Sequence, residues 1–228
     1  MNNISNLLNG ICNLVNQNKA IIESYRYQIE YKEDNTPVTK ADTYIENLIR
    51  AYLIEELGDV TFIGEESYRD TLLESNPYIA ILDPIDGTEN FCSGLKEWGI
   101  SFCLWSENKC LGSLIYLPEL NLKLMSGQNI IPKTSRIVGL SSAVNGQLLD
   151  EMKNPEQYRI MGCAVYNLYN VIHGSYKKFI NPVGARVWDF LPGVMLAYEY
   201  GCKVLIDGET YKGEFLDPKR KYKILIER

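Results

Sequence analysis

The sequence has 228 residues, 46% of them hydrophobic, which is enough to bury a substantial core in one large domain or two closely packed lobes. The formal net charge of -6 argues against nucleic acid polymers and anionic membranes as main partners, because such partners are bound by basic patches. A small anionic substrate is compatible with this charge if metal ions supply positive charge locally.

The cysteines and the N-terminus indicate a reducing, soluble setting. The six cysteines are scattered and include no C-x-x-C pair, so we expect reduced, mostly buried thiols. No stretch approaches the ~20 apolar residues of a membrane span, and the N-terminus lacks the basic and apolar regions of a signal peptide. We therefore expect a cytoplasmic protein.

The first third of the chain predicts two helices. Apolar residues recur at helical spacing from Ile4 to Val15, and this first helix can extend past Ile22. Residues 32–37 are polar and contain a proline, which predicts an exposed, mobile loop. A second helix is expected from Thr39 to about Leu57. Its opening matches a capping box, in which the third helical residue accepts the N-cap amide.

A short strand over residues 60–63 leads into Gly64-Glu65-Glu66-Ser67. Two adjacent acids after a buried strand usually form a solvated loop end. In layered α/β folds, however, the tip of a strand is also where ligands bind. Both interpretations of Glu65 stay open at this point.

The most informative stretch is residues 78–91, in which five apolar residues run into Asp83-Pro84-Ile85-Asp86-Gly87-Thr88. Pro84 cannot donate to a strand ladder, so we expect the strand to stop at Asp83 and both aspartates to converge on a tight loop. Two carboxylates about 4 Å apart repel by roughly 4 kcal/mol at an effective dielectric of 20. If both carboxylates converge, the turn needs a compensating cation. The alternative is an ordinary turn, because Asp, Pro and Gly are common turn residues.

A hard divalent cation suits these ligands. Carboxylates, the carbonyl of Ile85 and water match Mg²⁺ or Mn²⁺, whereas the thiols and the single histidine form no recognisable zinc set. The backbone N–H groups of Gly87 and Thr88 would lie beside the ion. If a helix begins there, its N-terminus is an anion site.

The remainder predicts an antiparallel meander followed by alternating helices and strands. The meander covers residues 99–105, 109–117 and 121–125, and the alternating units begin at Arg136. No linker divides the halves, so we expect a single domain over residues 1–228, with an α+β lobe at 1–135 and an α/β lobe at 136–228.

A last helix is expected after Trp188. Asp189 is well placed to cap it, Pro192 is tolerated in its first turn, and Gly201 ends it. Capping is the commonest role of an aspartate in this position. The only histidine, His173, follows an apolar helix beside a glycine, and a structural or surface role is expected for it.

Four stretches together resemble the inositol monophosphatase superfamily of metal-dependent, lithium-sensitive phosphatases. They are Val38-Thr39-Lys40-Ala41-Asp42, Ile63-Gly64-Glu65-Glu66-Ser67, Leu82-Asp83-Pro84-Ile85-Asp86-Gly87-Thr88-Glu89-Asn90-Phe91 and Trp188-Asp189. The resemblance implies a layered αβαβα sandwich, as in the inositol monophosphatase and fructose-1,6-bisphosphatase type. It also implies hydrolysis of phosphate monoesters with two or three Mg²⁺ ions.

The resemblance further implies roles for individual residues. Metals would be held by Glu65, Asp83, the Ile85 carbonyl, Asp86 and Asp189, with Glu65 also counted as catalytic. Thr88, oriented by Asp42, would position the attacking water, and the amides of Gly87 and Thr88 would hold the phosphate. Gly162-Cys163-Ala164 resembles a small-residue turn that touches the substrate, although small residues at a helix start are equally consistent with packing.

The substrate expected from the resemblance is a small phosphorylated metabolite. Residues 179–186 lack the acid that inositol-specific members use to grip ring hydroxyls, and residues 32–37 are similar to a loop of bisphosphate nucleotidases and histidinol phosphatases. The segment from Met125 to Arg136 is short, which bears on the substrate rim and on the geometry of a possible homodimer. A non-catalytic metal- or phosphate-binding relative is the alternative class.

Two other Asp-containing motifs fit less well. Haloacid-dehalogenase-type phosphatases separate their aspartates by one residue, so that both lie on one face of a strand end. Here two residues intervene, which disfavours an aspartyl nucleophile at Asp83. An EF-hand would need ligands that alternate ahead of the glycine.

Overall fold

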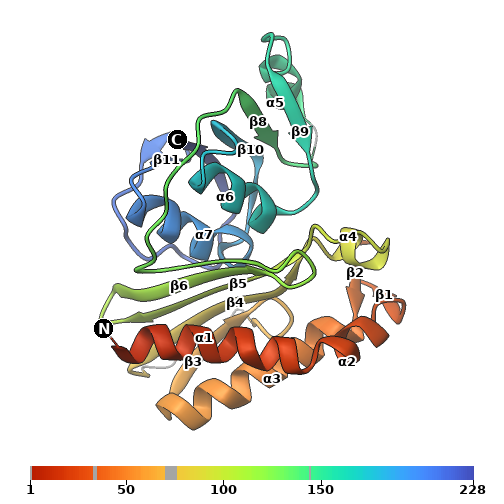
Figure 1. Ribbon diagram of the computed structural model, residues 1–228, viewed down its shortest axis with the longest axis vertical. Coiled ribbons are helices and arrows are strands. Elements are labelled where there is room, and N and C mark those ends of the chain that lie inside the picture. Colours follow the sequence, from red (N-terminus) through yellow and green to blue (C-terminus); the bar gives the residue numbers. More distant parts are fainter. Residues whose placement is uncertain (1, 33–34, 70–75, 144) are drawn as a thin grey trace.

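The fold alternates layers of helices and sheets. This computed structural model describes residues 2–32, 35–69, 76–143 and 145–228. In Figure 1, α1 (Asn2–Gln17) and α3 (Lys40–Leu57) cover one face of a five-stranded sheet, and α6 (Ala164–Ile172) and α7 (Val187–Glu199) separate it from a six-stranded sheet. The short helix α5 (Gly146–Glu151) lies on the outer side. The predicted αβαβα sandwich is therefore confirmed.

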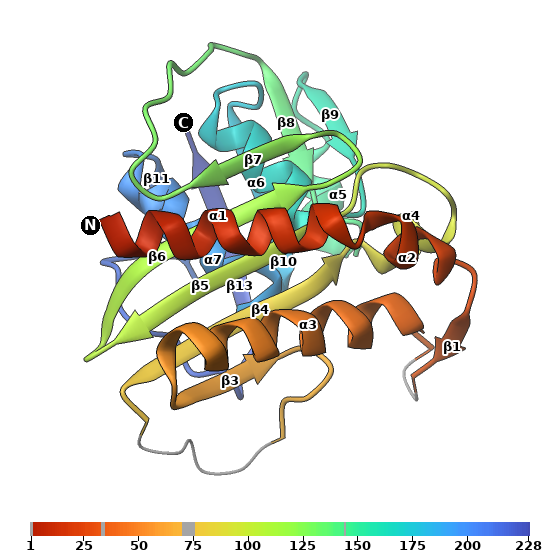
Figure 2. The same cartoon turned by 60° about the horizontal axis from the view of Figure 1, so that its bottom comes forward.

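The five-stranded sheet carries the predicted meander and has apolar residues on both faces. Its order is β3 (Val60–Gly64), β4 (Tyr78–Asp86), β5 (Gly99–Ser106), β6 (Lys109–Leu117) and β7 (Leu122–Met125), and only β3 and β4 run parallel. Ile81 packs toward α6 and α7, while its neighbours Ala80 and Leu82 pack toward α1 and α3. Because side chains alternate between the two faces along each strand, the sheet contributes to two separate hydrophobic cores. Figure 2 shows α1 and α3 lying across the second face.

The six-stranded sheet is mixed and contains strands that the sequence analysis did not anticipate. Its order is β12 (Glu209–Thr210), β11 (Lys203–Ile206), β13 (Tyr222–Glu227), β10 (Lys178–Ala185), β8 (Ile137–Leu140) and β9 (Gln157–Ile160). The sequence does contain a strand pattern for β13, because Tyr222, Ile224 and Ile226 occupy alternate positions and are buried.

The N-terminal segments agree with the prediction except in the loop. The first helix is followed by α2 (Lys19–Ser24), and α3 begins and ends as expected, with Thr39 as N-cap and Gly58 as C-cap. The expected loop at 32–37 is bordered by a small hairpin of β1 (Ile29–Tyr31) and β2 (Pro37–Thr39), and its residues 33 and 34 lie outside the described part. No helix in the described part is long and apolar enough to cross a bilayer.

Two predicted boundaries were wrong. The strand β4 does not stop at Asp83 but continues to Asp86, because a bulge absorbs Pro84. The helix α7 starts at Val187, one turn earlier than expected, so Pro192 lies inside it and Asp189 is its third residue. The N-cap is Arg186, whose extended backbone allows its N–H to donate to Asp189 Oδ2 over 2.8 Å. An arginine N-cap carries no sequence signal.

Candidate active site

The bulge in β4 places both motif aspartates on one face of the sheet. Asp83 pairs with Ser101 and Asp86 with Gly99, so three steps along β4 match two along β5. Residues three apart on a regular strand point to opposite faces, but one extra residue restores the same face. Asp83 and Asp86 consequently both face the layer of α6 and α7.

The turn after β4 is closed by a glycine in the left-handed region. Gly87 has φ 83° and precedes the short helix α4 (Thr88–Cys92). A Cβ atom at this position would lie 2.9 Å from Cys163 Cβ, so glycine is required by conformation and by space. The Thr88 hydroxyl donates to the Ile85 carbonyl over 2.9 Å, and the Ile85 N–H donates to Asp83 Oδ1 over 3.0 Å.

The N-terminus of α6 holds the Asp86 carboxylate. The Cys163 thiol donates to Asp86 Oδ2 over 2.9 Å, and the Val165 N–H donates to the same oxygen over 2.5 Å. Cys163 is also the N-cap of α6 and accepts from the Tyr166 N–H. The small-residue turn expected at 162–164 therefore has a defined task, which is to seat an acid at a helix N-terminus.

Asp42 confirms the predicted capping box, but among the described residues no hydrogen bond joins it to Thr88. Its Oδ2 accepts from the Thr39 N–H over 2.7 Å and from the Thr39 hydroxyl over 2.6 Å. Its Oδ1 is buried and has no hydrogen-bond partner among the described residues. The expected orientation of Thr88 by Asp42 is absent here, because the Thr88 hydroxyl is engaged by Ile85. Burial raises the pKa of Asp42 to about 7, against the lowering effect of Thr39.

Lys32 reaches from the N-terminal hairpin to the acids after β3. Its Nζ lies 2.8 Å from Glu65 Oε1 and 2.8 Å from Glu66 Oε1. Burial lowers the pKa of Lys32, but the two glutamates more than offset this and raise it overall. This role of Lys32 was not predicted, because a polar loop gives no sign of a partner 33 positions further on.

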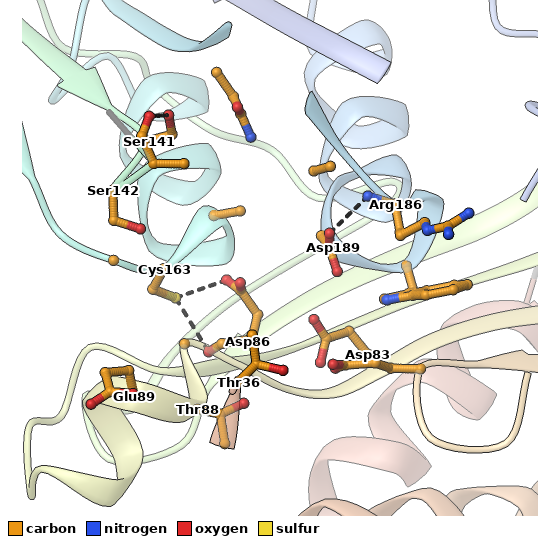
Figure 3. A pocket seen from close by; sticks show the side chains of 18 of the residues that line it. Thr36, Asp83, Asp86, Thr88, Glu89, Ser141, Ser142, Cys163, Arg186 and Asp189 are labelled. Atoms are coloured by element: carbon orange, nitrogen blue, oxygen red, sulfur yellow. Dashed lines mark hydrogen bonds between the residues drawn. The ribbon is translucent and has the colours of Figure 1, made fainter. Parts of the chain in front are cut away.

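Most of these groups line one cavity of about 700 Å³. Figure 3 shows Asp83, Asp86 and Thr88 from the β4 turn facing Asp189 at the start of α7, with Cys163 beside Asp86. Every predicted site residue except Asp42 contributes to the lining. Further lining residues were not predicted, and they include Ser141, Ser142, Asn181, Arg186 and Lys221.

The cavity acids disfavour one another's charge. Burial, followed by the charges of Glu65, Asp86 and Asp189, raises the pKa of Asp83 well above its ordinary value. Burial is also the main cause that raises the pKa of Asp86 to about 7 and that of Asp189 to about 8. The site therefore needs positive charge for all its carboxylates to ionise at neutral pH.

The donor set fits a hard cation, although the acids are not gathered around one point. No three His, Cys, Asp or Glu side chains of the described chain form a ready coordination sphere. The carboxylates are instead engaged by internal donors, as with Lys32 on Glu65, Cys163 on Asp86 and the Arg186 N–H on Asp189. The nearby oxygens are carboxylates and the Ile85 carbonyl, which suits Mg²⁺ or Mn²⁺ once these donors give way.

The fold and site define a class of layered phosphatase-like proteins, and sequence comparison identifies the family. A sequence model of the inositol monophosphatase family matches residues 4–134, which is more than half of the chain. The chain belongs to this family.

Individual comparisons agree with this assignment. A chloroplastic bifunctional phosphatase of Arabidopsis thaliana is 25% identical over 78% of this chain, and a 3'(2'),5'-bisphosphate nucleotidase of Haemophilus influenzae is 30% identical over 50% of it. The aligned parts cover 58% and 45% of those two relatives. The structure of an IMPase/NADP phosphatase complexed with Mg²⁺ and phosphate shares the fold, with a TM-score of 0.79, 19% identity, and coverage of 95% of this chain and 88% of that one.

Proposed function

We propose that this protein is a Mg²⁺-dependent phosphate monoester hydrolase acting on a small phosphorylated metabolite. The observation that carries the proposal is the group of mutually repelling acids, Asp83, Asp86 and Asp189, in a cavity also bordered by Glu65 and by the N-termini of α6 and α7. Such a group is costly unless cations bind there. Family membership supports the same chemistry. A homodimer and a cytoplasmic location stay predictions.

The proposed division of labour follows the contacts. Two or three ions would be held by Glu65, Asp83, the Ile85 carbonyl, Asp86 and Asp189. When bound, Mg²⁺ supplies Lewis acidity toward phosphoryl oxygens and lowers the pKa of water. The N–H groups of Gly87 and Thr88 would orient the phosphate.

Thr88 and Asp42 would handle the proton of the attacking water. The Thr88 hydroxyl donates to the Ile85 carbonyl in this structure, and it would turn from that carbonyl to hold the water. Asp42 offers an unpartnered oxygen and a pKa of about 7, which suits a proton acceptor at neutral pH. Thr88→Ala is therefore expected to lower kcat more than metal affinity.

The test is Mg²⁺-dependent phosphate release from a panel of inositol phosphates, 3'-phosphoadenosine 5'-phosphate, fructose 1,6-bisphosphate and histidinol phosphate. Asp83→Asn is the control, and its turnover should fall to background. Equal rates in both proteins would refute hydrolysis at this site and favour a non-catalytic binding protein. Inhibition by millimolar lithium is expected as well, and full resistance would count against the proposal.

A second candidate, a bisphosphorylated substrate such as that of the nucleotidase, is favoured by one cation of the cavity lining. Lys221 lines the cavity, and its charge opposes the rise in the pKa of Asp189. Its ammonium group would suit a second anionic group of the substrate. In the same panel, a Lys221→Gln variant should show a higher KM for bisphosphates but not for monophosphates.

A further inference from the structure

Two thiols meet in the core on neighbouring strands, away from the candidate active site. Cys103 on β5 and Cys110 on β6 belong to the same hydrophobic cluster, and Cys110 Sγ lies 3.4 Å from Oγ of Ser113, the residue that pairs with Cys103. Cys103 is fully buried, whereas Cys110 is half-buried. Neither residue lines the cavity that holds the acids.

A second β-bulge creates this pair. Cys103 pairs with Ser113 and Trp105 with Cys110, so two steps along β5 match three along β6. The extra residue is Leu111, whose side chain is exposed. In a regular strand, Ser113 and Cys110 would point to opposite faces, but one extra residue turns Cys110 to the face of Cys103.

The two sulfurs have different surroundings. The Trp105 indole N–H donates to Cys103 Sγ over 3.1 Å, and Cys110 Sγ lies 3.4 Å from Ser113 Oγ. Burial raises the pKa of Cys103 well above its ordinary value. Hydrogen bonds from Cys103 foremost, and from Ser113 and the Gly112 N–H, lower the pKa of Cys110. A thiol with stabilised thiolate, partial exposure and an adjacent second thiol is the arrangement of oxidation-sensitive cysteines.

We propose that Cys103 and Cys110 form a reversible dithiol–disulfide pair that is oxidised by hydroperoxides. The Cys110 thiolate attacks a peroxide oxygen, which breaks the O–O bond and gives a sulfenic acid and hydroxide. The Cys103 sulfur then attacks Cys110 Sγ, and its proton leaves with the sulfenic oxygen as water. Two thiols are oxidised and one hydrogen peroxide is reduced to water. Since Cys110 already lies against the residue that pairs with Cys103, on the same face of the sheet, closure requires no change in strand pairing.

The experiment counts thiols in the intact protein before and after treatment with hydrogen peroxide. The chain has six cysteines, and we expect the number of titratable thiols in the denatured sample to fall to four. Digestion without reductant should give one peptide pair joined through Cys103 and Cys110, lighter by two hydrogen atoms. Dithiothreitol should restore the original count.

Two half-buried cysteines provide a matched comparison. Cys110→Ser should form no cross-link, whereas Cys92→Ser, which changes a half-buried thiol on α4, should still form it. The wild-type peptide map decides the matter even if one variant fails to fold. An unchanged thiol count, a cross-link through other cysteines, or oxidation of Cys110 to a sulfinic acid without a cross-link would overturn the proposal.

Discussion

Replacing Asp86 by asparagine should make the metal-free protein more stable at alkaline pH while abolishing its proposed activity. The pKa of Asp86 rises from 3.8 to about 7 in the folded protein. The folded state therefore holds this proton more tightly than the unfolded chain does. As pH rises from about 4 to about 7, the unfolded chain gives up its proton first, and the wild type loses stability.

The magnitude follows from the pKa difference and the contacts that Asp86 makes. A rise from 3.8 to about 7 corresponds to about 4 kcal/mol at pH above the folded pKa. Asp86 borders an open cavity, so solvent reduces this penalty, and asparagine weakens the bonds from Cys163 and Val165 by about 1–2 kcal/mol. We expect a net gain of about 2 kcal/mol, or about 4–8 °C in Tm.

Thermal unfolding in the presence of a chelator, at about pH 8 and about pH 5, tests this reasoning. At about pH 5 the penalty has fallen below ~2 kcal/mol, and the lost hydrogen bonds should cancel the advantage. Mg²⁺ should raise the Tm of the wild type but not that of the variant, because the ion binds only the folded carboxylate cluster. A variant that is less stable than the wild type at about pH 8 without metal would refute the argument.

Three further predictions concern the surroundings of the site. Gly87→Ala should destabilise the protein by more than about 1–2 kcal/mol in denaturant titrations, because Gly87 has a positive φ and an added Cβ would be too close to Cys163. Gly201 also has a positive φ but has open space around it, so Gly201→Ala should cost less. Lys32→Gln should raise Mg²⁺ affinity by calorimetry, since the ammonium competes for the glutamates; unchanged affinity would disprove competition. Arg26 forms an ion pair with Glu119, whose side chain is 12% exposed and also accepts from the Trp98 indole N–H. Arg26→Met should therefore cost about 2–3 kcal/mol, and a change below ~1 kcal/mol would contradict this.

Local patterns explain what the sequence predicted correctly. The helix from Lys40 to Leu57 has its own cap, face and stop, and the strands of the meander have regular spacing and tight turns. The acids of the site were predicted because the Asp-Pro-Ile-Asp-Gly-Thr stretch and the Trp-Asp pair are specific motifs. The resemblance to the family then connected the two motifs, although the family model matches only residues 4–134, which contain the first of them.

Tertiary pairing explains what the sequence could not predict. The continuation of β4 to Asp86 depends on its register with β5, which no local pattern records. The same holds for Lys32, whose glutamate partners are contributed by the strand end after β3. The Thr88 hydroxyl was assigned to Asp42, but the structure gives it to Ile85 because that carbonyl lies within the same turn.

The irregularity in β4 makes the proposed chemistry sensitive to strand pairing, beyond the composition of the motif. If β4 paired with β5 without the bulge, every acid would remain in the sequence. Three regular steps would then separate Asp83 from Asp86, so the second carboxylate would face the helices α1 and α3. A mutation that straightens the strand would therefore separate the pair although neither acid is changed.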